Sequence, residues 1–148
     1  MPCYCFVPVH LICQRTIRLC KANKANVSAP QEILLPLLAE YKTYEALGNS
    51  YSKNDNNFVV IKFNFVRIDG GVFPTGVIGY AVLPKGFRPT SNIYFSTPYS
   101  TTLMTSEQLR PTFDGTVGCC IRTDGYLTTN LSTSNIKTLF GSVGFYGQ

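Results

Sequence analysis

The sequence predicts an all-β fold, an antiparallel β-sandwich or jelly-roll-like head, and three observations support this prediction. Nine Tyr and ten Phe accompany many Val and Thr residues, and aromatic and branched side chains pack well on a pleated sheet. From Phe58 onward, short apolar runs are separated by Gly, Pro, Asp and Asn turns, which is typical of consecutive strands. No helical pattern alternates with these runs, so a parallel sheet is not expected.

The length and composition favour one folded domain. A chain of 148 residues is long enough for one compact core,. Hydrophobic residues make up 45% and charged residues only 14%, against a usual charged share of about 25%, which argues against disorder. We place a single β-sandwich head at residues 31–148, preceded by an atypical leader or arm at residues 1–30.

The first thirty residues differ in character from the remainder. A short apolar stretch from Cys5 to Cys13 precedes a basic run that begins at Arg15. A secretory signal has the opposite order, with its charges before the apolar region, and the stretch is too short to span a bilayer. We therefore expect no membrane insertion.

The following elements are placed by their turn residues. Ser28 and Pro30 suit the start of a helix and Pro36 would interrupt it, so the segment to Gly48 is predicted as short helical turns or an extended lead-in. Asn49–Asn57 is predicted as a polar loop. The expected strands are Phe58–Ile68, Gly76–Leu83, Ile93–Tyr99, Thr116–Arg122, Tyr126–Asn130 and Leu139–Tyr146.

Details of these strands give further expectations. In the first, Ile61, Phe63 and Phe65 share one face, with Lys62 and Asn64 on the other. Pro98 indicates an edge or a bulge. Asp69–Gly71 and Thr123–Gly125 are turn signals, Leu83–Pro89 is an irregular crossing, and Ser100–Thr112 is the longest loop. Phe145 and Tyr146 are expected to be held in the sheet or against another subunit.

The cysteines do not indicate a metal site. Cys3, Cys5, Cys13 and Cys20 are spaced unlike the paired ligands of tetrahedral zinc,. Cys119 and Cys120 are adjacent in a strand, so we expect one in the core and the other half exposed. No calcium loop or phosphate-binding glycine motif is present, and no metal or cofactor is expected.

Catalysis is not predicted. The only histidine is His10, in the leader. Asp69, Asp114 and Asp124 each precede a glycine, which turn geometry explains; an Asp114/Asp124 acid pair remains the alternative, as in a glycosidase. The net charge of +5 comes from dispersed basic residues, so nucleic-acid binding is not expected.

What remains is binding chemistry. Tyr and Phe offer flat apolar faces that suit sugar rings, and Asn, Thr, Asp and Arg add directional hydrogen bonds. The richest mixture begins at Asn92 and continues through the loop that follows. The candidate ligand-binding residues are Arg88, Tyr94, Tyr99, Arg110 and Asp114.

Two motifs resemble a known family. The run Gly79–Pro89, which contains Leu-Pro-Lys-Gly-Phe-Arg-Pro, is followed by Ile121-Arg-Thr-Asp-Gly-Tyr-Leu. This pattern, over roughly Leu38–Gln148, resembles the receptor-binding heads in tail fibres and baseplates of phages that infect Gram-positive bacteria. The resemblance assigns Leu83, Pro84, Gly86, Phe87 and Pro89 to the fold, and it transfers no saccharide-contacting residue.

The resemblance implies a function for the whole molecule. It implies a homotrimeric β-sandwich head at the phage tail tip or baseplate, attached to other tail proteins, which binds host cell-wall saccharide. A structural trimeric tip without receptor binding is the first alternative, and a carbohydrate-active enzyme fragment is the second.

Overall fold

The structure is a computed structural model that describes residues 29–44, 48–103, 112–133 and 135–148. Nearly all of the expected leader lies outside the described residues, together with its four cysteines and His10. Most of the expected Ser100–Thr112 loop, including Arg110, also lies outside them.

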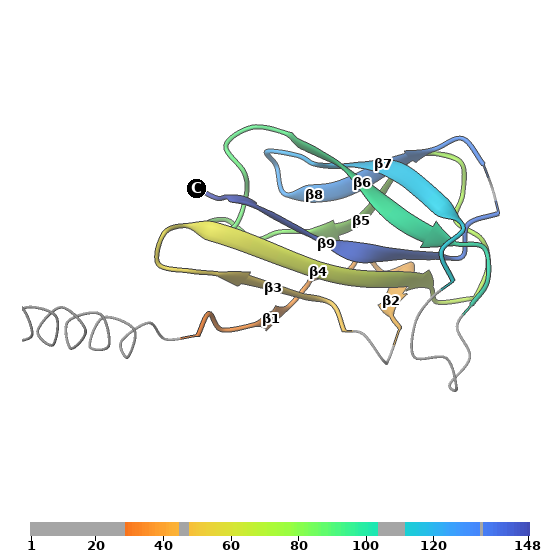
Figure 1. Ribbon diagram of the computed structural model, residues 1–148, viewed down its shortest axis with the longest axis horizontal. Coiled ribbons are helices and arrows are strands. Elements are labelled where there is room, and N and C mark those ends of the chain that lie inside the picture. The colour runs from red at the N-terminus through yellow and green to blue at the C-terminus, as the bar shows by residue number, and fades with distance from the viewer. Residues whose placement is uncertain (1–28, 45–47, 104–111, 134) are drawn as a thin grey trace, which may run out of the picture.

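The described chain is a single antiparallel sheet (Figure 1). The sheet runs in the order β1-β3-β4-β9-β6-β7-β8-β5, and β2 pairs with β4 beside β3. The strands are β1 (Ile33–Leu34), β2 (Tyr41–Thr43), β3 (Ser50–Lys53), β4 (Phe58–Arg67), β5 (Gly76–Val82), β6 (Ile93–Ser100), β7 (Gly115–Ile121), β8 (Tyr126–Leu131) and β9 (Thr138–Tyr146). The predicted all-β, antiparallel class is confirmed.

The sheet curls so that its two halves face each other (Figure 1). β4 pairs with β9 along its length, whereas β6 pairs with β9 only at Tyr99 and Ser100. The halves β1-β3-β4-β9 and β6-β7-β8-β5 therefore separate beyond this short junction. Most of one side of β6 is consequently a sheet edge, as Pro98 predicts.

A short closing segment, Pro36–Leu38, joins the two outer ends of the sheet. It follows β1, which pairs with β3, and it then runs beside the opposite edge strand, β5. The Leu38 N–H donates to the Tyr80 carbonyl at 2.8 Å, and the Val82 N–H donates to the Pro36 carbonyl at 3.1 Å. Through these hydrogen bonds the curled sheet closes on itself, which protects an edge that would otherwise be unpaired.

The core lies between the halves and is rich in aromatic rings. Tyr80 is centred among Phe65, Phe73 and Tyr41, with ring centroids 5.1–5.5 Å from its own. Ile61, Phe63 and Phe65 are buried and Lys62 is exposed, as alternation predicts, but Asn64 is buried as well. Phe145 is buried in β9, and Tyr146 on the opposite face is 70% exposed.

The N-terminal part differs from one expectation. Within residues 29–44 the extended alternative is found, with β1, the closing segment and β2 in place of helical turns. The prediction of a loop over Asn49–Asn57 is wrong, because β3 occupies Ser50–Lys53. Ser50 and Ser52 face away from Tyr51, which is buried, so pairing with β4 stabilises a strand that has a single core residue. No helix in the described ranges is long and apolar enough to cross a membrane.

Candidate functional site

A hollow lies on the outer face of β5, β8, β7 and β6. It has a volume of about 460 Å³, within the range of roughly 300–1,000 Å³ that is usual for small-molecule sites. The outward-facing residues that line it are Val77, Tyr94, Ser96, Gly118, Cys120, Thr128 and Asn130. We call it the outer-face hollow.

The strand register brings these residues together. Successive residues of a strand face opposite sides of a sheet, so the outward positions of neighbouring strands form rows. Tyr94 is opposite Cys120 and Ser96 is opposite Gly118. On the other side of β7, Cys120 is opposite Thr128, and Val77 of β5 is opposite Asn130. Four strands therefore contribute to one surface.

Two apolar side chains stand exposed at the hollow. Tyr94 is 76% exposed and Val77 is 75% exposed, which places a ring and a branched side chain in contact with solvent. The Ser96 hydroxyl and the Asn130 amide have no side-chain hydrogen bond within the described chain, so both are available to a ligand. The Thr128 hydroxyl donates to the Cys120 carbonyl at 3.2 Å and keeps its lone pairs as acceptors.

Among the residues that the structure describes, the lining of the hollow carries no Lys, Arg, Asp, Glu or His. Burial raises the pKa of the Cys119 thiol to about 11, and burial also raises the pKa of the Cys120 thiol, against an opposing effect of Arg122. Both thiols are therefore protonated at neutral pH. Cys119 is buried and Cys120 is half-buried, as predicted, and the described lining of the hollow is electrically neutral.

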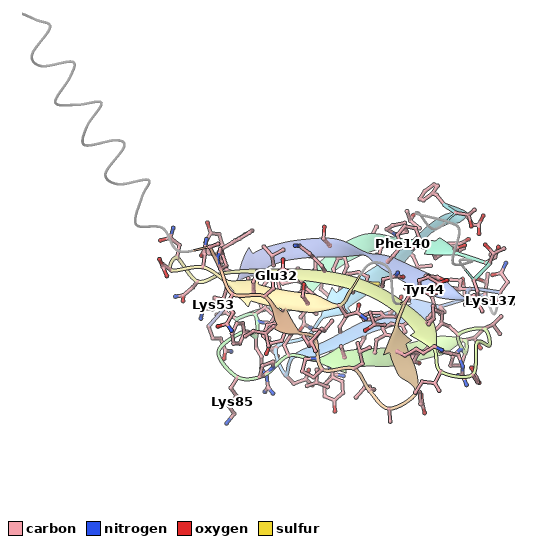
Figure 2. The ribbon with its side chains drawn as sticks, turned by 90° about the horizontal axis from the view of Figure 1, so that it is seen from below. Glu32, Tyr44, Lys53, Lys85, Lys137 and Phe140 are labelled. Atoms are coloured by element: carbon pink, nitrogen blue, oxygen red, sulfur yellow. The ribbon has the colours of Figure 1, made fainter. Side chains whose placement is uncertain are left out.

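The structure describes four of the five predicted site residues and places them in different parts of the molecule, while Arg110 lies outside the described residues. Of these four, Tyr94 alone belongs to the outer-face hollow. Arg88 lies at the end of the molecule where Lys53 and Lys85 are found, because Lys53 donates to the Gly86 carbonyl at 2.8 Å. Asp114 lies at the opposite end with Lys137 (Figure 2).

Arg88 and Tyr99 have structural contacts. The Arg88 Nε donates to the Leu83 carbonyl at 2.8 Å, and this bond braces the Leu83–Pro89 crossing beside Gly125. Gly125 has a φ of 93°, and a Cβ there would lie 2.5 Å from the Leu83 oxygen, so this turn requires glycine. Tyr99 packs against the core, with its ring over Gly115.

Asp114 is an anchor for the chain on either side of the Ser100–Thr112 loop. Its carboxylate accepts hydrogen bonds from the Thr101 N–H at 2.6 Å and the Thr101 hydroxyl at 2.8 Å. These two bonds and a longer one from the Ser100 hydroxyl lower the pKa of Asp114. The carboxylate is thus held ionised by its own neighbours.

The alternative acid pair is not supported by the geometry. Asp114 precedes β7 and Asp124 follows it, so the seven residues of β7 separate them. At about 3.3 Å per residue this places them roughly 20 Å apart, whereas glycosidase carboxylates lie about 5–9.5 Å apart. Asp124 instead pairs with Arg122 at 2.7 Å. Within the described ranges, no group of three or more His, Cys, Asp or Glu residues could hold a metal ion.

Sequence reasoning missed most of the hollow. Thr128 and Asn130 were predicted as strand residues, and Gly118 as part of a strand, without a role in binding. The alternation of each strand identifies its outward positions, but it does not reveal that β5 lies next to β8 and β6 next to β7. A second hollow of about 400 Å³ lies beside β1 and β3, where Glu32 and Lys62 already pair with each other.

The chain has few detectable relatives. No family model and no curated protein matches it. Among solved structures, it is similar to the receptor-binding protein (gp15) of Listeria phage PSA, with a TM-score of 0.58 and 13% sequence identity. The similarity covers 97% of this chain and 82% of that one. At this identity it shows that the two proteins share a fold.

Proposed function

We propose that this chain is a host-attachment head of a phage tail fibre or baseplate, which binds a cell-surface saccharide as a homotrimer. The observation that carries the proposal is the outer-face hollow, in which an exposed Tyr94 stands among uncharged polar groups. The shared fold with a phage receptor-binding protein supports it. A fold alone does not define a function, so the chemistry of the hollow has to supply the remaining support.

That chemistry suits a sugar. A pyranose has one comparatively apolar face and a rim of hydroxyl groups, and it pairs well with an aromatic ring beside hydrogen-bonding side chains. Tyr94 and Val77 offer the apolar contacts, while Ser96 and Asn130 offer the polar ones. No described residue of the hollow is arranged to transfer a proton or to attack a substrate,, so we propose binding without turnover.

The test is binding of the purified protein to whole cells and isolated wall polysaccharides of Gram-positive strains. We expect strain-selective binding that disappears when the saccharide is removed, and we expect Tyr94→Ala to weaken it at least tenfold. Tyr146→Ala is the matched control, because Tyr146 is also exposed but lies on β9 in the other half of the sheet. Equal losses in both variants would contradict the assignment to the hollow.

The homotrimer is tested separately by sedimentation analysis of the same preparation. A trimer is the expected result, and a monomer across the micromolar range would contradict this part of the proposal. A trimer that binds no strain would favour a structural tail tip. Release of reducing sugar from the polysaccharide would favour the enzyme fragment.

A further inference from the structure

Resting on the proposed function, we propose that Gly118 forms a bare floor of the outer-face hollow on which an uncharged pyranose ring lies, beside Tyr94. Gly118 is in the middle of β7, opposite Ser96 of β6. It is the position where a ligand can approach the backbone of the sheet, because no side chain stands between them.

Gly118 differs from the other eleven glycines, because it has neither a positive φ nor an atom within 3.4 Å of the place where a Cβ would be. All twelve glycines lie in the described ranges. Five have a positive φ, which favours glycine: Gly48, Gly70, Gly76, Gly86 and Gly125. Six others have an atom 2.6–3.4 Å from the place where a Cβ would be: Gly71, Gly79, Gly115, Gly141, Gly144 and Gly147.

Gly118 meets neither condition. Its φ is outside the left-handed region, and a Cβ built on it would have no atom within 4 Å. A glycine in the middle of a strand destabilises the fold relative to alanine, and branched residues suit strands better still. A side chain at residue 118 would therefore make the fold more stable. The glycine instead leaves open space in the hollow.

The surroundings of Gly118 indicate what occupies that space. The Thr129 hydroxyl donates to the Gly118 carbonyl, which fixes the backbone of the floor. The ring of Tyr94 and the side chains of Ser96 and Asn130 flank it. One face of a pyranose ring can then contact the backbone at Gly118 while its hydroxyl groups reach the polar side chains at the rim.

The charge of the lining selects the class of saccharide. Binding a phosphate or carboxylate in a site without a cation would remove its hydration and return no ion pair. Just beyond the end of β7, the charged side chains of Arg122 and Asp124 pair with each other at 2.7 Å. The hollow thus fits a neutral sugar of a wall polysaccharide rather than the glycerol-phosphate chain of a teichoic acid.

The first experiment compares Gly118→Val with Thr116→Val, which places a valine on the same face of β7 outside the hollow by exchanging a hydroxyl for a methyl group. We expect Gly118→Val to raise the thermal unfolding midpoint and to weaken cell binding at least tenfold. Thr116→Val should leave binding unchanged. A lower midpoint for Gly118→Val would show that the fold requires this glycine, and unaltered binding would show that the floor is not used; either result overturns the inference.

The second experiment determines the ligand class, with neutral wall polysaccharide and poly(glycerol phosphate) as the two probes. We expect the neutral polymer to bind and to shift the backbone amide signal of Gly118 in the full-length protein, with no binding of the anionic polymer. Binding of poly(glycerol phosphate) alone would overturn the neutral class and leave the proposed attachment function standing. Wild-type protein that binds no cell and no polymer would overturn the proposed function itself, and this inference with it.

Discussion

Asn49 substitutes for a piece of backbone at the edge of β4. β2 and β3 pair with the same edge of β4, at Phe65–Arg67 and Val59–Lys62 respectively, and a gap is left between them. The Asn49 Oδ1 accepts from the Asn64 N–H at 2.6 Å, and its Nδ2 donates to the Asn64 carbonyl at 3.2 Å. The amide therefore continues the ladder across the gap, where an unpaired backbone group would be costly.

We expect Asn49→Ala to lower the free energy of unfolding by about 2 kcal/mol, because the buried N–H of Asn64 loses its acceptor. Urea unfolding followed by fluorescence measures the change. Asn56→Ala is the control, since Asn56 is exposed in the β3–β4 turn. Similar midpoints for the two variants would show that the Asn49 amide does not stabilise the gap.

At this scale the sequence predicts some roles and not others. Cys119 and Cys120 face opposite sides because they are neighbours in a strand, and this holds without tertiary information. The sequence suggests only a loop residue at Asn49. Its role cannot be predicted, because its partner Asn64 lies on another strand and the gap that it fills depends on where β2 and β3 end. Tyr94 was predicted to bind a ligand from its chemistry, and its 76% exposure is compatible with that role.

Hairpins are the elements that the sequence predicts best. The β7–β8 pair follows from Asp124 and Gly125 between two apolar runs, and the structure confirms it. β3 was missed because its polar composition obscures the single buried Tyr51. A strand with one core residue is stabilised mainly by pairing with its neighbour, and that information lies in β4 rather than in β3 itself.

The chain segments that flank the long loop are linked by Asp114, which gives a pH prediction. The folded-state pKa of Asp114 is below its ordinary value because of the hydrogen bonds from Thr101. Its contribution to stability is therefore present above the unfolded-state pKa, near 3.9, and is lost as the pH falls through the folded-state value. We expect amide exchange at Thr101 to accelerate under these acidic conditions, measured by hydrogen–deuterium exchange.

Asp114→Asn removes the titrating group and serves as the comparison for this experiment. In that variant the amide exchange at Thr101, corrected for the intrinsic effect of pH, should be insensitive to acid. If the variant keeps the same acid response as the wild type, another group controls this end of the molecule.

The whole molecule depends on contacts that no local pattern reveals. β9, the last strand, inserts between β4 and β6, and the closing segment joins β5 to the end that contains β1. Alternation predicts which side chains of a strand share a face, but the order of strands is set by packing across the core. For this reason the fold class was predictable, whereas the hollow, which requires four strands in the right order, was not.

Closure of the sheet can be tested with Leu38→Pro, which removes the N–H that donates to the Tyr80 carbonyl. We expect a loss of about 3 kcal/mol in the free energy of unfolding, because proline removes a ladder hydrogen bond and restricts the backbone. Leu38→Ala keeps the N–H and isolates the effect of the side chain. Equal losses in the two variants would show that the hydrogen bond does not hold the sheet closed.

The closing segment also determines the order in which the molecule assembles. The β7–β8 and β3–β4 hairpins join residues close in sequence and can form early, whereas Pro36–Leu38 meets β5 only after both halves of the sheet exist. Contacts absent from the folding transition state affect unfolding more than folding. Changes in the closing segment are therefore expected to alter how long the folded molecule survives, and to leave the time it takes to fold almost unchanged.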